Sequence, residues 1–246
     1  NIAHDCNLAC KYCFASQGDY GGVKRELMSF DVAKRAVDFL IQMSGSRQHC
    51  EIDFFGGEPL LNWEVVKQTV EYIEQEAPKY NKIFKLTLTT NGMLLNQEKI
   101  DYVNEHKMSL VLSLDGREDV HNAMRPVAGS GANSYEYIAK NLVNAVKQRH
   151  GLEYYVRGTY THKNLDFTKD VMAMSDLGFE HWVEVAYSVP IIKNEYKVKL
   201  LLLLDFKVED KELLDYLVMS WKYRDLVLHS VRMYEMERNN NFTILY

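Results

Sequence analysis

Apolar residues along this chain alternate between the spacing of amphipathic helices and the short runs of buried strands. Residues 29–45 have helical spacing, with Ser29 as the expected N-cap and Gly45 as the stop. Residues 51–55 form a short apolar run that two glycines and a proline end sharply, as expected of a strand. Residues 63–77 return to helical spacing, with Asn62 as the expected cap. Residues 29–77 therefore predict a helix, a strand and a second helix in that order.

The apolar positions of these two helices predict the faces that meet the core. In the first helix the expected core positions are Val32, Ala36, Phe39 and Leu40. In the second helix they are Val65, Val66, Val70 and Ile73.

The same alternation continues to about residue 190 and predicts a parallel sheet. Further strands are expected at 84–92, 109–116, 153–161 and 181–189, and further helices at 96–106, 134–149 and 167–177. Strands separated by helices of this length imply right-handed βαβ crossovers and an α/β fold. With a first strand at or before Ile2, we expect six βα units in residues 1–190.

Residues 191–246 break this pattern, and we expect them to form a separate, mainly helical C-terminal tail. Residues 210–236 are amphipathic and predict a helix, whereas residues 239–246 predict a turn and a final strand. The longest apolar run, Leu200 to Leu204, is far shorter than the roughly 20 residues of a membrane span. We expect no membrane segment and, without a secretory signal, a cytoplasmic protein.

The net charge and the positions of the cysteines indicate which partners and cofactors to expect. The net charge is −5 and the basic residues are scattered, which argues against a nucleic-acid partner. Of the four cysteines, Cys6, Cys10 and Cys13 lie within eight residues, spaced as Cys-x3-Cys-x2-Cys. A short loop can wrap three thiolates around an iron–sulfur cluster and leave one iron open. The alternative is a structural zinc site, with His4 or Cys50 as a fourth ligand.

Unusual residues follow each of the first five expected strands. Parallel barrels carry their chemistry at the carboxyl ends of the strands, so we expect these segments to share one rim. They are the cysteine loop, Gly56-Gly57-Glu58-Pro59, Thr90-Asn91-Gly92, Ser113-Leu114-Asp115-Gly116 and Arg157-Gly158-Thr159.

The string "CNLACKYC" together with "GGEP" after the second expected strand resembles the radical S-adenosylmethionine (SAM) superfamily. The resemblance covers about residues 1–190 and implies a partial (β/α)6 TIM-like barrel. It also implies that Cys6, Cys10 and Cys13 ligate a 4Fe–4S cluster, whose fourth iron binds SAM. The backbone at Gly56 and Gly57 would then hold the SAM amino group, since glycine allows close backbone approach, and Glu58 would complement its charge. The alternative for this segment is a plain strand-to-helix turn with a solvated glutamate.

The resemblance assigns further SAM-binding roles. Ser113 and Arg125 resemble the partners of the SAM carboxylate and ribose, because a guanidinium suits a carboxylate. Asp115 ranks below Ser113, because it could cap the next segment instead. Plausible neighbours of the ribose or adenine are Asn91, Thr159, Tyr12 and Phe14. For the two aromatic residues, a place in the core is the alternative.

Within the superfamily, strings such as "DFFGGEPLLN", "LTTNG" and "YYVRGTYT" resemble the maturases of six-cysteine peptides. That resemblance implies a cysteine-rich peptide substrate, thioether bonds from cysteine to an α-carbon, and an electron donor such as ferredoxin or flavodoxin. Sulfatase-maturase-like or other peptide modification is the second enzymatic interpretation, and a non-catalytic zinc or cluster scaffold is the third. No cysteine follows Cys50, so auxiliary clusters of the kind found in such relatives are not expected from these residues.

Overall fold

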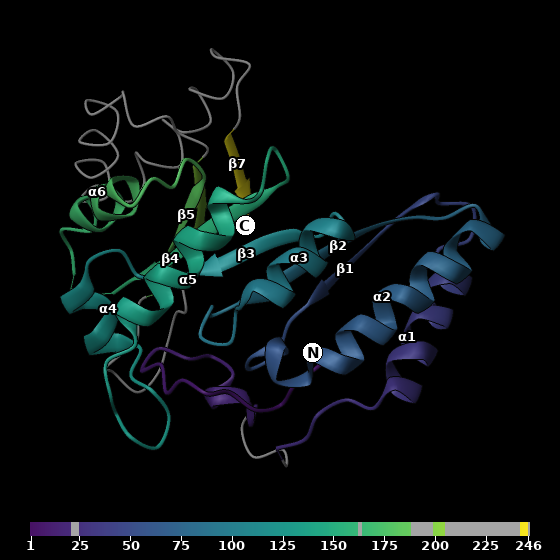
Figure 1. Ribbon diagram of the computed structural model, residues 1–246, viewed down its shortest axis with the longest axis horizontal. Helices are drawn as coiled ribbons and strands as arrows, with labels where there is room; N and C mark the ends of the chain where they lie inside the picture. Colours follow the sequence, from purple (N-terminus) through teal and green to yellow (C-terminus); the bar gives the residue numbers. More distant parts are fainter. Residues whose placement is uncertain (21–24, 162–163, 188–198, 205–241, 246) are drawn as a thin grey trace. The chain divides into compact units, whose positions relative to one another are not determined.

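The computed structural model describes residues 1–20, 25–161, 164–187, 199–204 and 242–245, and the chain packs into two units. The first unit comprises residues 1–113 and 122–154, and the second comprises residues 114–121 and 155–246. Between residues 30 and 187, at least one helix separates each pair of successive strands (Figure 1).

The first unit is built on three parallel strands. These are β1 (His49–Phe54), β2 (Ile83–Thr90) and β3 (Ser109–Ser113), with β1 pairing with β2 and β2 with β3. The helices of this unit are α1 (Phe30–Met43), α2 (Trp63–Glu76), α3 (Gln97–Glu105) and α5 (Tyr135–Lys147), with short 3-10 turns at Ser16–Gly18, Pro59–Asn62 and Ala77–Tyr80. Because the strands are parallel, the segments that follow β1, β2 and β3 leave the sheet at the same edge.

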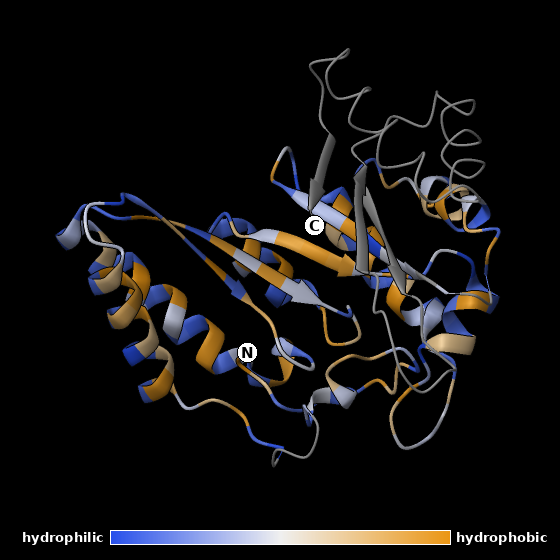
Figure 2. Cartoon of the chain, turned by 180° about the vertical axis from the view of Figure 1, so that it is seen from behind, coloured by the Kyte–Doolittle hydropathy of each residue, from blue (hydrophilic) through white to orange (hydrophobic). Residues whose placement is uncertain are grey.

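The core of the first unit fills the space between these strands and their helices. α1 and α2 lie side by side and carry apolar and polar residues on different faces (Figures 1 and 2). The side chains that are at most 2% exposed in this core include those of Val66, Val70, Ile73, Leu88, Ile100, Val103, Leu110, Leu112, Ile138 and Leu142. Burial of these side chains is the main force holding the three strands and their helices together.

The second unit contains a parallel pair followed by antiparallel strands. β4 (Tyr154–Tyr160) pairs in parallel with β5 (Trp182–Tyr187), and α6 (Thr168–Asp176) connects them. β5 then pairs antiparallel with β6 (Lys199–Leu204), and β6 with β7 (Phe242–Leu245). The short helix α4 (Glu118–Met124) spans the boundary between the residue ranges of the two units.

Most expected elements are confirmed to within two residues, and their caps explain why. Ser29 caps α1 by accepting a hydrogen bond from the Val32 N–H at 3.4 Å, and Asn96 caps α3 in the same way. Gly45 after α1 and Gly178 after α6 have left-handed φ values of +53° and +86°. Asn62, expected to cap α2, instead donates to the Ile2 and Met28 carbonyls at 2.9 Å each. It ties the N-terminal segment to the start of α2.

The core-facing side of α1 differs from the predicted one. Val32 and Phe39 are 41% and 62% exposed, whereas Ala33, Val37 and Ile41 are buried. Both sets have helical spacing, so periodicity alone cannot distinguish them. In α2 the predicted face is confirmed, with Val65 half-buried and the other three positions buried.

We expect opposite consequences for substitutions on the two faces of α1. Ile41→Ala should lower the free energy of unfolding by roughly 2–5 kcal/mol, because it opens a cavity in the core. Phe39→Ala should change it by less than about 0.5 kcal/mol, because that ring already contacts solvent. Urea titrations followed by circular dichroism measure both. Equal losses would mean that Phe39 is buried in solution.

The expected first strand is reduced to two isolated bridges at one residue. Ala3 pairs in parallel with Gly56 and antiparallel with Leu27, and no described strand lies at residues 1–5. Three hydrogen bonds nevertheless hold this segment beside the end of β1, including Ile2 N–H to the Phe55 carbonyl at 2.7 Å. The N-terminal segment therefore lies beside the end of β1, and the cysteine loop begins there.

Several predictions for the tail fall outside the described residues, including the boundary at 190 and the helix at 210–236. The final strand is confirmed as β7, while the leucine run forms β6, a strand that the sequence analysis missed. Among the described residues, none of the helices is long and apolar enough to span a bilayer.

Candidate functional site

The cysteine loop is fastened to the turn that follows β1. The Gly57 N–H donates to the Ala3 carbonyl and the Glu58 N–H to the Asp5 carbonyl, both at 2.8 Å. A Cβ on Gly56 would lie 2.3 Å from the Ala3 oxygen, and one on Gly57 would lie 2.1 Å from the Asp5 oxygen. The two glycines therefore allow the close approach of the chain segment leading into Cys6, and their contact with the SAM amino group stays a prediction.

The other side of the cysteine loop runs along residues 124–128. The Ala9 N–H donates to the Pro126 carbonyl and the Lys11 N–H to the Met124 carbonyl, at 2.8 and 2.9 Å. This pairing brings Arg125, which is 4% exposed, beside the loop, where it donates to the Tyr12 hydroxyl at 3.3 Å. Two segments more than a hundred residues apart thus lie together.

None of the three loop cysteines forms a disulfide, and all three thiols are half-buried. The Asn91 amide nitrogen lies 3.8 Å from the Cys6 sulfur, and the Gln17 N–H donates to the Cys13 sulfur at 3.2 Å. Burial raises the pKa of the Cys6 thiol to about 12, and Glu58, Cys10 and Cys13 add to the rise. Because thiolates are the ligating form, a metal centre bound here must displace the Cys6 proton.

An iron–sulfur cluster fits the residues around this loop. Cys6 is close enough to Cys10 and Cys13 for their charges to raise its pKa. The Asn7 amide nitrogen and the Tyr20 hydroxyl are buried and have no hydrogen-bond partner within the described part of the chain. Such donors are normally paired, and cluster sulfurs accept hydrogen bonds. Among the described residues, no group of three His, Cys, Asp or Glu side chains is spaced to hold a single metal ion.

Glu58 is buried and hydrogen-bonded within the protein. It is 0% exposed, and its carboxylate accepts hydrogen bonds from the Leu60 N–H, the Thr90 hydroxyl and the Asn91 N–H at 3.0, 2.7 and 2.8 Å. Burial raises its pKa, while these hydrogen bonds and the charge of Arg125 oppose the rise. Through these three hydrogen bonds the carboxylate connects the turn after β1 to the end of β2. The solvated-glutamate interpretation is therefore wrong.

The Asn91 side chain is hydrogen-bonded to the cysteine loop. Its amide nitrogen donates to the Asn7 side-chain oxygen at 2.7 Å, and its own side-chain oxygen accepts from the Met93 N–H at 2.9 Å. Ser113 ends β3, is half-buried, and directly follows Leu112, which pairs with Thr90. Both residues therefore lie at the edge that holds the cysteine loop. The sequence analysis missed Asn7 because nothing in its local pattern marks it.

Phe14 is exposed rather than buried in the core. It is 56% exposed, stacks on Phe55 with ring centroids 6.0 Å apart, and makes an edge-to-face contact with the Tyr20 ring at 6.5 Å. The alternative that this ring is part of the core is therefore wrong. The ring lies on the surface, at the residue that directly follows Cys13.

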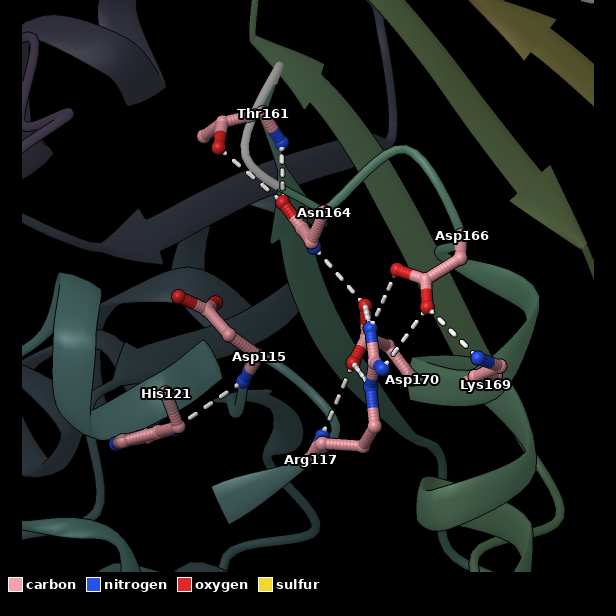
Figure 3. A network of polar contacts seen from close by, with 8 residues as sticks. All are labelled: Asp115, Arg117, His121, Thr161, Asn164, Asp166, Lys169 and Asp170. Atoms are coloured by element: carbon pink, nitrogen blue, oxygen red, sulfur yellow. Dashed lines mark hydrogen bonds and ion pairs between the residues drawn. The ribbon is translucent and has the colours of Figure 1, made fainter. Parts of the chain in front are cut away.

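Asp115 and Thr159 lie together in the second unit. The Asp115 carboxylate accepts a hydrogen bond from the Thr159 N–H at 3.1 Å, and its own N–H donates to the buried His121 ring at 3.3 Å. Next to it, Arg117 binds the buried carboxylate of Asp170 at 2.7 Å and that of Asp166 at 2.8 Å (Figure 3). These contacts join residues 115–117 to β4 and to residues 166–170 at the start of α6.

We expect Asp166 to stabilise this network in a pH-dependent way. Hydrogen bonds from Arg117, and then from Lys169, lower its pKa from 3.8 to about 2. Its contribution is therefore complete above pH 3.8 and is lost as the pH falls towards 2. Because the carboxylate is 46% exposed, Asp166→Asn should cost only about 0.2–1 kcal/mol at pH 7.

Urea titrations of Asp166→Asn and the wild type at pH 7 and pH 3 measure this effect. The difference between the two proteins should shrink at pH 3. Asp176→Asn, an exposed residue of α6 with no ion pair among the described residues, is the matched control. An equal loss at both pH values would contradict the ionic origin.

Two protein-family models match parts of this chain. The family model described as the radical SAM superfamily matches residues 1–165, and a model described as a family of unknown function (DUF7720) matches residues 163–242. An uncharacterized protein of Methanocaldococcus jannaschii is 25% identical over 169 residues, 69% of this chain and 54% of the relative. A cysteine-type anaerobic sulfatase-maturating enzyme of Clostridium perfringens is 33% identical over 123 residues, 49% of this chain and 32% of the relative.

Solved structures confirm the fold. A structure titled as native anSMEcpe with bound AdoMet and a peptide superposes with a TM-score of 0.69 at 22% identity, covering 93% of this chain and 60% of that one. The chain therefore has the α/β, partial TIM-barrel fold of such enzymes, as the sequence predicted. It spans between a third and about half of the length of the two curated relatives.

Proposed function

Because this chain belongs to the radical SAM superfamily, we propose that it cleaves SAM reductively at a 4Fe–4S cluster held by Cys6, Cys10 and Cys13. The cofactors of the chain are SAM and an iron–sulfur cluster. One observation carries the proposal: three half-buried thiols on a loop that is hydrogen-bonded to the glycine turn after β1.

When bound, the cluster supplies one electron that splits the sulfonium bond of SAM, and the resulting 5′-deoxyadenosyl radical takes a hydrogen atom from the substrate. In the proposal, the loop thiolates hold three irons, and the backbone at Gly56 and Gly57 faces the SAM amino group. The buried guanidinium of Arg125 supplies a positive charge for the SAM carboxylate. Asn91 orients the first ligand through its contact with Cys6.

We propose a peptide as the substrate and, more specifically, formation of Cys-to-α-carbon thioethers in a cysteine-rich ribosomal peptide. A peptide is supported by the structural relative whose title includes a bound peptide. The thioether chemistry rests on the resemblance to six-cysteine peptide maturases. Ferredoxin or flavodoxin is the proposed electron donor.

A second candidate is oxidation of a cysteine to formylglycine, and the match to a cysteine-type sulfatase-maturating enzyme favours it. Co-expression with a cysteine-rich peptide and mass spectrometry separates the two candidates. Loss of two hydrogens per bond, with the thiols blocked to alkylation, indicates thioethers. An aldehyde product indicates formylglycine.

Anaerobic reconstitution with iron and sulfide tests the shared step. With dithionite and SAM, the reconstituted protein should form 5′-deoxyadenosine. A correctly assembled cluster that yields no product would overturn SAM cleavage. Stoichiometric zinc, without iron–sulfur absorbance after reconstitution, would instead support the non-catalytic scaffold.

A further inference from the structure

Tyr20 lies in a loop that folds back over the cysteines. Its N–H donates to the Ala15 carbonyl at 2.9 Å, and its φ of +50° is left-handed, which is rare for a bulky residue. Ser16 and Gln17 are also left-handed, with φ values of +48° and +60°. Three such residues in five indicate that the path of this loop is imposed by its surroundings.

The loop is pressed against the segment that leads into Cys6. A Cβ on Gly18 would lie 2.6 Å from the Asp5 nitrogen, so the two backbones are in contact. The Tyr20 ring meets the His4 ring at a centroid distance of 5.0 Å and makes an edge-to-face contact with the Phe14 ring at 6.5 Å. The ring is thus fixed between the residues that precede Cys6 and the residue that follows Cys13.

The Tyr20 hydroxyl is buried there with no hydrogen-bond partner among residues 1–20, 25–161 and the other described ranges. A buried phenol normally finds an acceptor, because an unpaired one is costly. Burial raises the pKa of Tyr20, and negative charge on Cys13 and Cys6 adds to the rise. The ring contacts with His4 and Phe14 place the phenol beside the cysteine loop. The charges that act on it there are those of the first and third loop cysteines.

We propose that the Tyr20 hydroxyl donates a hydrogen bond to a sulfur of the bound cluster on the side of Cys6 and Cys13 and thereby raises its reduction potential. This inference rests on the cluster of the proposed function. A donor to sulfur stabilises the reduced cluster more than the oxidised one, because reduction adds negative charge that the sulfurs share. Tyr20 is then a positioning and tuning residue that does not contact the substrate.

The test compares reconstituted wild type with Tyr20→Phe, in the absence of SAM, by redox titration monitored with electron paramagnetic resonance. Tyr20→Phe keeps the ring contacts with His4 and Phe14 and removes only the hydroxyl. We expect equal iron and sulfide content and a midpoint potential shifted to a more negative value. Tyr137→Phe, at a 58% exposed tyrosine on α5, should leave the potential unchanged.

A second measurement detects the proposed hydrogen bond directly. Electron–nuclear double resonance of the reduced wild-type cluster should detect a coupled proton that disappears after exchange into D2O and is absent from Tyr20→Phe. An unchanged midpoint in Tyr20→Phe with a full cluster, or no exchangeable proton in the wild type, would overturn the role of Tyr20 alone. A wild type that assembles no cluster would overturn the proposed function as well.

Discussion

Cys10→Ala should lose the cluster and with it SAM cleavage, reducing 5′-deoxyadenosine to the background of a protein-free control. Three thiolates are the protein ligands expected for the cluster, and two cannot hold it in place. The variant should still fold, since Cys10 is half-buried on a loop. Iron and sulfide content, absorbance and product formation after anaerobic reconstitution measure the effect.

Cys50→Ala is the matched control for this loss. Cys50 is a free thiol 5% exposed in β1, where it pairs with Phe84 of β2. Its removal should lower stability slightly and leave iron content and product formation at wild-type levels. Wild-type iron and turnover in Cys10→Ala would show that the loop does not bind the cluster.

Glu58→Ala should be among the most destabilising single substitutions in the first unit. It would leave three donors, the Leu60 N–H, the Thr90 hydroxyl and the Asn91 N–H, without their acceptor. Each buried unpaired donor costs roughly 1–3 kcal/mol, so we expect a loss of at least about 3 kcal/mol in the free energy of unfolding. Guanidinium titration of the metal-free protein measures it.

Two further variants show whether the loss comes from the buried hydrogen bonds. Glu58→Gln retains one acceptor oxygen and should lie between Glu58→Ala and the wild type. Glu64→Ala removes a 76% exposed carboxylate of α2 that pairs with Lys67, and should change stability by less than about 1 kcal/mol. If Glu58→Ala unfolds at the same guanidinium concentration as the wild type, the carboxylate does not connect β1 and β2.

Local patterns predicted most elements because caps and stops act over a few residues. Ser29 and Gly45 mark the two ends of α1 in the structure as they do in the sequence. Periodicity failed for α1, which has two apolar stripes at the same spacing, and only packing determines that Val37 rather than Phe39 is buried.

The sequence by itself determined the α/β alternation, the clustered thiols and the resemblance to one superfamily, because each depends on residues close together along the chain. Only the tertiary structure decided which partners the site residues have. Glu58 contacts Thr90, and Asn91 contacts Cys6, across 32 and 85 residues respectively. Such pairs form where parallel strands end side by side, and no local spacing specifies which side chains will satisfy one another once water is excluded.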